Sequence, residues 1–415
     1  MNRILLVRMK IEVDQKLRDE QAGFRKDRSC VDQIATLRNI IEQSLEWNSP
    51  LYVTFVDFEK AFDSVDRESL WKILAHYGIP EKLICLIKKT YKPSTCQVVH
   101  NGSLTEPFNI LTGVRQGCIL SPFLFLLAID WIMSRTVEGQ NRGIQWSLLK
   151  QLEDIDFADD ITLLSQRHRN MQDKTNSLDA NGGKLGMKIN IPKTKSMRAN
   201  QTNHDPITLR GEALEEVDKF PHLGSIVSRD GGTEQDIAVR IGKATGAFKI
   251  LRPIWTSRVI SVQTKLRLFN SNVKTVLLYA CETWRSTKAS TNKLQTFINK
   301  CLRNILRIRW EDRVRNEDLW ERTGQERIET VVTRRKWNWM GHILRRPKSI
   351  TCHALRWHPQ GKRSRGRPRT TWRRSTEAEA KSVGLQLNDL ERVAKDRRGW
   401  RGIVTDLCPD RGGRG

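Results

Sequence analysis

The chain has 415 residues, which is enough for two or three domains with buried cores. Its net charge of +25 indicates a polyanionic partner, and residues 300–415 alone hold 30 Lys and Arg against 14 Asp and Glu. No apolar run reaches the roughly 18 residues of a membrane span and the N-terminus lacks the features of a signal peptide, which predicts an intracellular protein of the nucleus or cytoplasm, without a membrane segment.

The first part of the chain alternates strand-like and helix-like segments. "LYVTFVD", residues 51–57, is rich in β-branched and aromatic residues, as a buried strand would be, and it ends on Asp57. The segment "SVDRESLWKILAHYGIP" predicts a helix capped by Asp66 and stopped by the Gly and Pro that follow, and "EKLICLIKKTY" predicts a second helix. Turn residues and short extended pieces lead to an apolar helix, for which Ser121 is the expected cap and Pro122 the first helical position.

The next elements are a hairpin and then mostly helices. "QLEDIDFADDITLLS", residues 151–165, predicts a hairpin with Asp159 and Asp160 at its tip. A helix broken at a Gly-Gly pair follows, then a strand "MKINI" and a basic turn. Beyond about residue 225 helices dominate, with "SVQTKLRLFNSNVKTVLLY" the clearest, and the segment from about 345 to 374 is typical of an extended basic linker.

The aspartates at these strand ends suggest a metal site. Adjacent carboxylates such as Asp159 and Asp160 repel each other and lose water on burial, so they need either solvent or a cation. An ordinary solvated turn is the alternative, because Asp is common in turns. Asp57 also ends an apolar strand, however, so in one sheet the three carboxylates could converge on one point. Mg²⁺ prefers oxygen ligands, and two such ions roughly 4 Å apart serve phosphoryl transfer.

Six ordered motifs resemble those of reverse transcriptases from non-long-terminal-repeat (LINE-type) retrotransposons, most closely the RTE group. They are "QAGFRKDRSCVDQIATLRNIIEQ", "VDFEKAFDSVDRESLW", "GVRQGCILSPFLF", "DFADDITLLS", "GMKINIPKTKSM" and "FPHLGSIVSRDGG". The resemblance extends over nearly the whole chain, through "NVKTVLLYACETWR", "RRKWNWMGHILRRP", "GKRSRGRPRTTWR" and "DRRGWR". It implies an α+β right-hand polymerase fold, whose antiparallel palm sheet packs on helices. The implied domains are partial fingers at 1–50, the palm at 51–225, a thumb-like helical region at 226–310 and a basic, mainly helical, nucleic-acid-binding region at 311–415.

The resemblance also implies the chemistry of the site. Asp57, Asp159 and Asp160 match the family's metal-binding aspartates, and the backbone carbonyl of Phe58 matches a further ligand. Two Mg²⁺ ions are the implied cofactors, with Mn²⁺ as the alternative ion. The implied reaction is template-directed attack of a primer 3′-hydroxyl on a deoxynucleoside triphosphate. The partners would then be an RNA template, a DNA primer or target and dNTPs, with no small-molecule cofactor.

Other positions match residues that contact the substrate. Phe62 matches the bulky residue that would clash with a ribose 2′-hydroxyl, although plain core packing is the alternative. Gln116 and Gly117 match the loop that contacts the incoming nucleotide and the template, where glycine lets the backbone approach closely. Lys193 matches the basic residue proposed to protonate the pyrophosphate leaving group. Lys195 lies close enough in sequence to take that role instead, and a solvated lysine is the third possibility.

The chain departs from the family pattern at its start and near its middle. Nothing matches the endonuclease of full-length relatives, and the chain is expected to begin inside the fingers, without the upstream segment whose basic residues grip the triphosphate. Arg25 is the remaining candidate for that contact. His222 replaces the tyrosine usual near the primer-holding turn. The alternatives to an active polymerase are a truncated relic that only binds nucleic acid and an intron-splicing maturase.

The basic tail suggests contacts with nucleic acid. In "RRKWNWMGHILRR" aromatic residues alternate with cations, which suits stacking on unpaired bases, although Trp337 and Trp339 could equally be core residues. "RSRGRPRTTWRR" has an Arg-Gly-Arg-Pro core like those in AT-rich minor grooves, and a flexible linker or nuclear import signal explains it as well. Trp and Arg are interleaved rather than segregated, which argues against membrane-surface binding. The candidate nucleic-acid-binding residues are Arg334, Arg335, Lys336, Arg365, Arg367 and Arg369.

The cysteines indicate neither a disulfide framework nor a zinc site. Eight of them are scattered along the chain without a CxxC pair, which fits reduced thiols. A metal site is one interpretation of Cys352, His353, His358 and Cys408, but the spacing of these residues fits no zinc knuckle.

Overall fold

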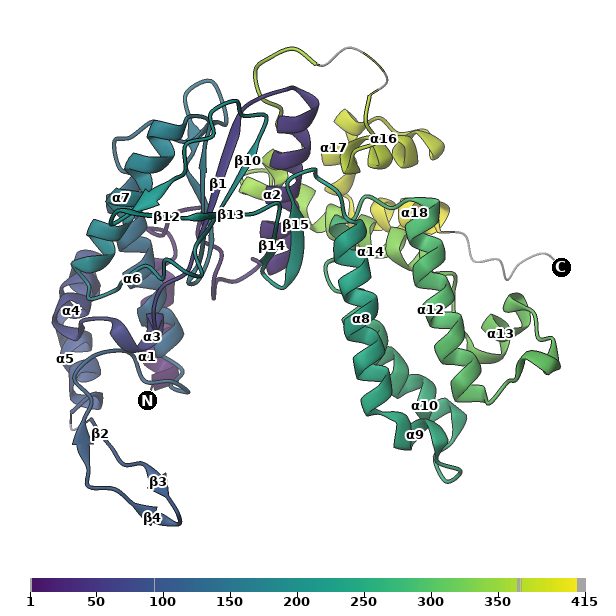
Figure 1. The fold of residues 1–415 in the computed structure, drawn as a ribbon, viewed down its shortest axis with the longest axis horizontal. Helices are drawn as coiled ribbons and strands as arrows, with labels where there is room; N and C mark the ends of the chain where they lie inside the picture. The colour runs from purple at the N-terminus through teal and green to yellow at the C-terminus, as the bar shows by residue number, and fades with distance from the viewer. Residues whose placement is uncertain (1, 93, 364–365, 367, 409–415) are drawn as a thin grey trace. The chain divides into compact units, whose positions relative to one another are not determined.

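The computed structural model describes residues 2–92, 94–363, 366 and 368–408, and it divides into two compact units (Figure 1). The first unit contains the residues up to Gln33, Asn48–Asp218 and Pro359–Lys362. The second contains Ile34–Trp47, Lys219–His358 and the chain from Arg363 onward. Each unit is therefore assembled from stretches that lie far apart in the sequence. Most of helix α2 (Cys30–Glu46), which the sequence places in the fingers, packs in the second unit.

A five-stranded sheet in the order β13-β10-β1-β9-β8 forms the centre of the first unit. The middle strand β1 (Leu51–Val56) is buried at all of its positions, as its run of β-branched and aromatic residues predicts. It pairs antiparallel with β10 (Lys195–Ala199) on one side and with β9 (Asp160–Ser165) on the other. β9 forms an antiparallel hairpin with β8 (Asp154–Phe157), and the short edge strand β13 (Glu215–Glu216) runs parallel to β10.

Helices pack on this sheet and complete the core of the first unit. Helix α7 (His168–Gly183) packs against β1 and β9, and α6 (Ser121–Val137) packs against both α7 and α4 (Arg67–His76). The apolar α6 is buried along almost its whole length. The predicted α+β fold, with an antiparallel sheet packed on helices, is thus confirmed, except that the edge strand is parallel. The remaining helices of this unit are α1 (Asn2–Val13), α3 (Ala61–Ser64) and α5 (Glu81–Thr90).

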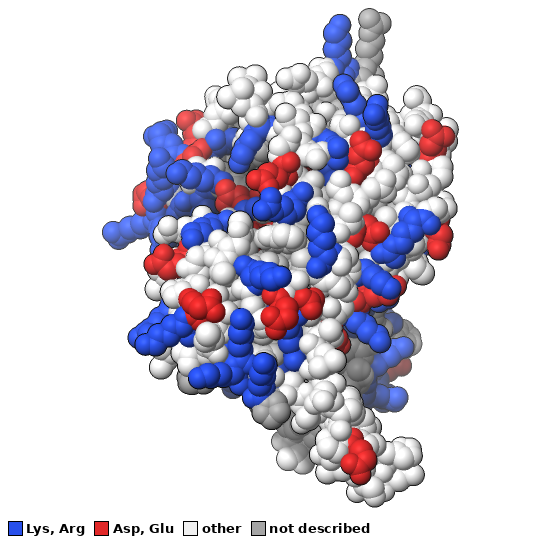
Figure 2. Space-filling view, turned by 90° about the vertical axis from the view of Figure 1, so that its left-hand side faces the viewer, with Lys and Arg blue, Asp and Glu red and all other residues white. Residues whose placement is uncertain are grey.

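The first unit also carries a projecting arm made of four short strands (Figure 1). They are β2 (Thr95–Cys96), β3 (Val99–His100), β4 (Ser103–Leu104) and β5 (Phe108–Asn109). Figure 2 shows this arm as a nearly uncharged projection below a face on which Lys and Arg are mixed with Asp and Glu. Two further small ladders join β6 (Ile144–Gln145) to β7 (Gln151–Leu152) and β11 (Thr208–Leu209) to β12 (Glu212–Ala213).

The second unit is almost entirely helical, apart from the hairpin of β14 (Lys219–His222) and β15 (Ser225–Ser228). One apolar core joins α8 (Glu234–Ile250), α9 (Arg252–Thr256), α10 (Val262–Leu268), α11 (Thr275–Leu277), α12 (Lys288–Leu306) and α13 (Asn316–Thr323). Another joins α14 (Ile328–Leu344), α15 (Ile350–Ala354), α16 (Trp372–Ser382), α17 (Leu390–Ala394) and α18 (Arg397–Leu407). Within the described ranges of the chain, no helix combines the length and the apolar character that crossing a membrane requires.

Several predicted elements need correction. Asp66 caps α4 as predicted, because its carboxylate accepts a hydrogen bond from the Ser69 amide at 2.7 Å. Ser121, however, is the first residue of α6 rather than its cap, and its hydroxyl donates to the carbonyl of Arg115. The predicted strand "MKINI" is wrong, since it contributes one isolated bridge through Ile189. The strand lies instead at β10, in the segment predicted as a basic turn.

The helical predictions for the second unit are also only partly right. The long helix predicted around residues 261–279 is divided, because a π-helical turn at Phe269–Lys274 lies between α10 and α11. The predicted linker 345–374 contains helix α15, which Ser349 caps by accepting a hydrogen bond from the Cys352 amide. Ile350 and Cys352 are buried, so this part of the predicted linker is packed structure.

Candidate active site

The sheet register brings the three predicted carboxylates to one end of β1, β8 and β9. The last residue of β1 lies opposite Ile161 of β9, so Asp57 follows at the level of Asp160. The β8–β9 hairpin closes through Ala158 and Asp159, and Ala158 adopts a left-handed φ of 57° to make the turn. The convergence that the sequence predicts from strand ends therefore follows from antiparallel pairing.

The pKa values show that these carboxylates sense one another. Loss of hydrating water, with a smaller contribution from the negative charge of Asp57, raises the pKa of Asp159 above its ordinary value. The same loss of water, followed by the charges of Asp159 and Asp57, raises the pKa of Asp160 to about 6. The site therefore holds excess negative charge, and a cation would relieve it.

Lys193 is the cation that approaches this site. Its Nζ lies 3.5 Å from Oδ2 of Asp57, an oxygen that is buried and has no hydrogen-bond partner. The loop that carries Lys193 is held beside the strand end because the Asp57 amide donates to Oγ1 of Thr194 at 3.3 Å. Lys195 points elsewhere, since its Nζ contacts a carboxylate oxygen of Glu215 at 2.6 Å. The geometry thus favours Lys193 over Lys195 for the predicted role.

The donor set suits a hard divalent cation. Three carboxylates supply only oxygen ligands, and the buried Oδ2 of Asp57, which accepts no hydrogen bond, would gain a bond to the ion. In the described part of the chain, no three His, Cys, Asp or Glu side chains are arranged to hold an ion as they stand. The carboxylates of Asp57, Asp159 and Asp160 would therefore have to turn toward one another, and Lys193 would have to withdraw, when an ion binds.

The predicted substrate-contact residues lie in two neighbouring segments. Phe62 is half-buried and stacks on Phe125 with 4.1 Å between ring centroids, so it combines core packing with an exposed edge. Gln116 is exposed, and its side-chain amide donates to Oδ1 of Asp63 at 3.1 Å, which links the two segments. Gly117 adopts a φ of 82°, a conformation that favours glycine, and no other atom crowds it. The backbone at Gly117 is therefore open to a ligand.

Arg25 does not fit its predicted contact with the triphosphate. Its guanidinium donates to Oδ1 of Asp14 at 2.9 Å and to the backbone carbonyls of Arg18 and Gln21 at 2.6 and 3.0 Å. Only 7% of the side chain is exposed. Arg25 therefore holds its own segment together. Phe58, whose carbonyl was the further expected ligand, has its side chain buried in the core.

The structure separates the predicted nucleic-acid-binding residues of the tail. Arg334 and Arg335 are half-exposed and pair with Glu326 and Glu282, at 2.6 and 2.9 Å. Lys336 is buried, and its ammonium lies 2.5 Å from a carboxylate oxygen of Glu379. Burial lowers the pKa of Lys336, and the carboxylate of Glu379 offsets only part of this effect. We therefore no longer count Lys336 among the candidates.

The aromatic and arginine residues singled out in the tail lie in different environments. Trp337 is a core residue, because it is fully buried and its Nε1 donates to Glu379 at 2.6 Å. Trp339 is half-buried and lies edge-to-face with Trp372. Arg369 is exposed, whereas Arg365 and Arg367 lie outside the described residues.

Three other residues singled out in the sequence are packed inside the second unit. Cys352 and Cys408 are buried thiols. His222 ends β14, and burial together with the charge of Arg38 lowers its pKa to about 3, so its ring is neutral.

Sequence reasoning missed a clamp on the aspartate turn. The side-chain carbonyl of Gln21 accepts hydrogen bonds from the amides of Ala158 and Gly23 at 2.8 and 2.7 Å, and its amide donates to the Ala158 carbonyl at 3.3 Å. A Cβ on Gly23 would lie 2.2 Å from the Ala158 nitrogen, so only glycine permits this approach. The motif "QAGF" carries both residues, and it was the available signal.

A second missed feature is a buried ion network beneath the hairpin. Arg18 pairs with Asp154, with Asp156 at 2.8 Å and with Asp130 at 3.6 Å, and the three carboxylates are almost fully buried. The hydroxyl of Tyr77 donates to Asp130 at 2.5 Å. The alternate acidic residues of "EDIDF" could have signalled it, since inward-facing acids on a buried strand require a cation.

Comparisons with known proteins agree with this architecture. The sequence profile of the reverse transcriptase (RNA-dependent DNA polymerase) family matches residues 1–227, and a domain of unknown function, DUF6451, matches residues 247–279. The Pol polyprotein of the type-2 retrotransposable element R2DM of Drosophila melanogaster is 28% identical over 42% of this chain and 16% of its own length. The RNA-directed DNA polymerase of the mobile element jockey, from the same fly, is 22% identical over 76% of this chain and 34% of its own length.

The chain thus spans a minor part of these two relatives. Among solved structures, apo telomerase from Candida tropicalis matches with a TM-score of 0.43 and 12% identity, over 85% of this chain and 61% of the telomerase, a likeness too low to carry over any property. The family profile covers more than half of the sequence and includes all three converging aspartates. The chain belongs to the reverse transcriptase (RNA-dependent DNA polymerase) family.

Proposed function

We propose that this chain extends a DNA primer by copying an RNA template, with Asp57, Asp159 and Asp160 as its metal-binding carboxylates. The observation that carries the proposal is the strand register, which aligns Asp57 with Asp160. Oδ2 of Asp57 is buried there and lacks a hydrogen-bond partner. The raised pKa of Asp160 supports it, because mutual repulsion among the acids is the cost that a bound cation would offset.

Two bound Mg²⁺ ions, or Mn²⁺ in their place, would supply positive charge to the attacking and leaving oxygens of nucleotidyl transfer. The three aspartates would hold that charge at the strand ends. A bond forms between the primer O3′ and the α-phosphorus, the bond from that phosphorus to the bridging oxygen breaks, and pyrophosphate leaves. The 3′-hydroxyl passes its proton to water, and Lys193, whose Nζ lies 3.5 Å from Oδ2 of Asp57, would give one to the pyrophosphate.

The partners in this proposal are an RNA template, a DNA primer or target strand and dNTPs. Phe62 and Gln116 lie on segments that Asp63 joins, so we place the incoming nucleotide against these two residues and Gly117. The motifs favour the RTE-like group, and location in the nucleus or cytoplasm stays a prediction. The net charge of +25 supports a nucleic-acid partner.

Binding of a divalent ion is expected to weaken as the pH falls through 6. The pKa of Asp160 is raised to about 6, so below that pH a proton occupies the carboxylate that the ion needs. Electron paramagnetic resonance of Mn²⁺ with the full chain is expected to show an affinity about tenfold lower at pH 5 than at pH 7.5.

The Asp160→Asn variant is the control for this titration. It is expected to bind Mn²⁺ weakly at both pH values, with most of the pH dependence gone. Equal affinity of the unaltered chain at pH 5 and pH 7.5 would show that Asp160 is no ligand.

The two lysines near the site provide a matched pair of variants. Lys193→Gln is expected to slow single-nucleotide addition by about a hundredfold, because general-acid catalysis contributes on that scale. Lys195→Gln is expected to change the rate little, since that ammonium is bound to Glu215. Rapid-quench kinetics at saturating dNTP measures both rates. A larger loss in the Lys195 variant would reverse the assignment.

A further inference from the structure

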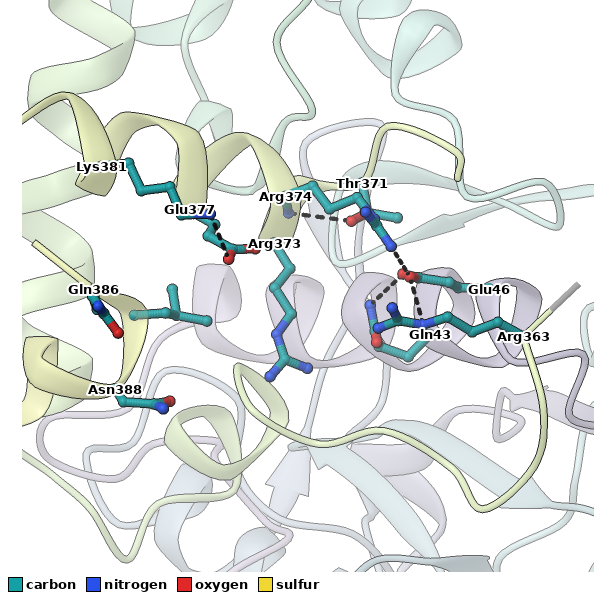
Figure 3. A pocket seen from close by; sticks show the side chains of 11 residues that line it. Gln43, Glu46, Arg363, Thr371, Arg373, Arg374, Glu377, Lys381, Gln386 and Asn388 are labelled. Carbon is teal, nitrogen blue, oxygen red and sulfur yellow. Dashed lines mark hydrogen bonds and ion pairs between the residues drawn. The ribbon is translucent and has the colours of Figure 1, made fainter. Parts of the chain in front are cut away.

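The second unit contains a polar pocket of about 610 Å³, with no residue of the three-aspartate site in its lining (Figure 3). Its walls come from the end of α2, one side of α16, Arg363 and the short 3-10 turn at Leu387–Asp389. The volume falls within the range of small-ligand sites. All of its lining residues belong to the second unit.

One carboxylate fixes two of the pocket's arginines. Oε1 of Glu46 lies 2.5 Å from the guanidinium of Arg374 and 3.2 Å from that of Arg363. The guanidinium of Arg363 also lies over the ring of Trp47, 4.6 Å from its centroid. The charges of this wall are therefore partly satisfied without a ligand.

Arg373 differs from these two arginines. Figure 3 shows its side chain pointing into the middle of the pocket, with no dashed line reaching it from the other residues drawn. Its one hydrogen bond within the described chain is from Nη1 to the carbonyl of Trp357 at 3.4 Å. Burial lowers its pKa, so the neighbouring Glu46 and Glu377 do not offset the water it has lost. A guanidinium with unused donors in a confined space is suited to an oxyanion.

The remaining walls offer what a nucleotide needs besides a phosphate contact. Lys381 adds a second cation on the same helix, and its ammonium lies 3.3 Å from the half-exposed carboxylate of Glu377. Gln386 and Asn388 lie across the pocket from Glu46 (Figure 3), and the apolar Leu387 also lines it. Amides can bond to base edges, and an apolar side chain can cover a base or sugar.

We propose that this pocket binds one nucleotide of a single-stranded nucleic acid, with its phosphate on Arg373 and Lys381 and its base near Gln386 and Asn388. The surrounding tail favours a polymer over a free nucleotide, since residues 300–415 carry +16 of the net charge of +25. The pocket shares no residue with the proposed polymerase site. Binding of an oligonucleotide to the pocket can therefore be measured without nucleotide addition.

The test measures binding of a fluorescein-labelled 12-residue oligouridylate to the full chain, by anisotropy over a series of salt concentrations. The pocket variant is Arg373→Gln with Lys381→Gln. Its matched control is Lys249→Gln with Arg252→Gln, which removes two exposed cations of the same unit that do not line the pocket. Thermal denaturation reports whether each variant is folded, and Lys381→Gln alone, a largely exposed position, serves if the double variant is not.

We expect the pocket variant to bind the oligonucleotide about tenfold more weakly than the control, with a salt slope smaller by about 0.7 for each lost phosphate contact. Crosslinking of a 4-thiouridine probe to the peptide around Gln386 and Asn388 should disappear together with the affinity. Equal affinity in the pocket and control variants would overturn the proposal. A second result would also overturn it: adenosine 5′-monophosphate prevents the crosslink to this peptide, yet the affinity for the oligonucleotide stays unchanged. The pocket would then bind a free nucleotide.

Discussion

Asp159→Asn is expected to abolish primer extension while leaving affinity for RNA within about twofold of the unaltered chain. The amide has the shape of the carboxylate but no charge, so the proposed metal site loses one anionic ligand and the turn keeps its geometry. Metal-ion stabilisation of the transition state is worth several kcal/mol, which corresponds to a rate loss of about a thousandfold or more. A single-turnover primer-extension assay with labelled DNA primer on RNA template measures it.

Asp173→Asn is the matched control for that variant. Asp173 lies on α7 and is partly exposed, and its nearest cation, Arg142, is 3.9 Å away. The substitution removes the same charge from the same unit, yet we expect the extension rate to stay within about twofold. An Asp159→Asn enzyme that extends primers as fast as this control would refute the site assignment.

Arg18→Met is expected to cause the largest loss of stability in the first unit. The guanidinium compensates Asp130, Asp154 and Asp156, and removing one partner of a buried ion network typically costs about 3–5 kcal/mol. For a unit of this size such a loss lowers the melting temperature on the order of 10 °C. Differential scanning calorimetry of the full chain measures the shift.

The pH dependence of that defect gives a second test. Arg18 lowers the pKa of Asp156 and Asp130 against the raising effect of burial, so its loss raises both further above their values in the unfolded chain. The folded variant then binds protons that its unfolded form releases, and its deficit relative to the unaltered chain should shrink as the pH falls from 7.5 to 5. Arg135→Met, which breaks an exposed pair with Glu138, should cost less than about 1 kcal/mol at either pH. A deficit that grows on acidification would contradict this account.

The sequence predicted those features that depend on local pattern. The buried strand before Asp57, the cap at Asp66 and the turn at Asp159 are each encoded within a few neighbouring residues, by β-branched runs, capping chemistry and turn chemistry. The convergence of the aspartates followed from strand ends together with the family motifs.

Features that depend on partners distant in sequence could not be predicted in this way. Lys336 appears in the sequence as one more cation of a basic run, and only the tertiary fold brings Glu379 to neutralise it. The strand β10 has the largely polar sequence KSMRA, and its pairing with β1 overrides that weak strand signal. Arg18 similarly shows no special role until β8 places Asp154 and Asp156 beside it.

The most direct test of the central claim is primer extension by the purified full chain on an RNA template, with a DNA primer, dNTPs and Mg²⁺, beside the Asp159→Asn, Asp160→Asn double variant. We predict that the unaltered chain adds templated nucleotides and that the double variant adds none, although both bind the template equally. If neither protein extends the primer while both bind RNA in a salt-sensitive manner, the chain is a nucleic-acid-binding relic whose aspartates no longer catalyse polymerisation.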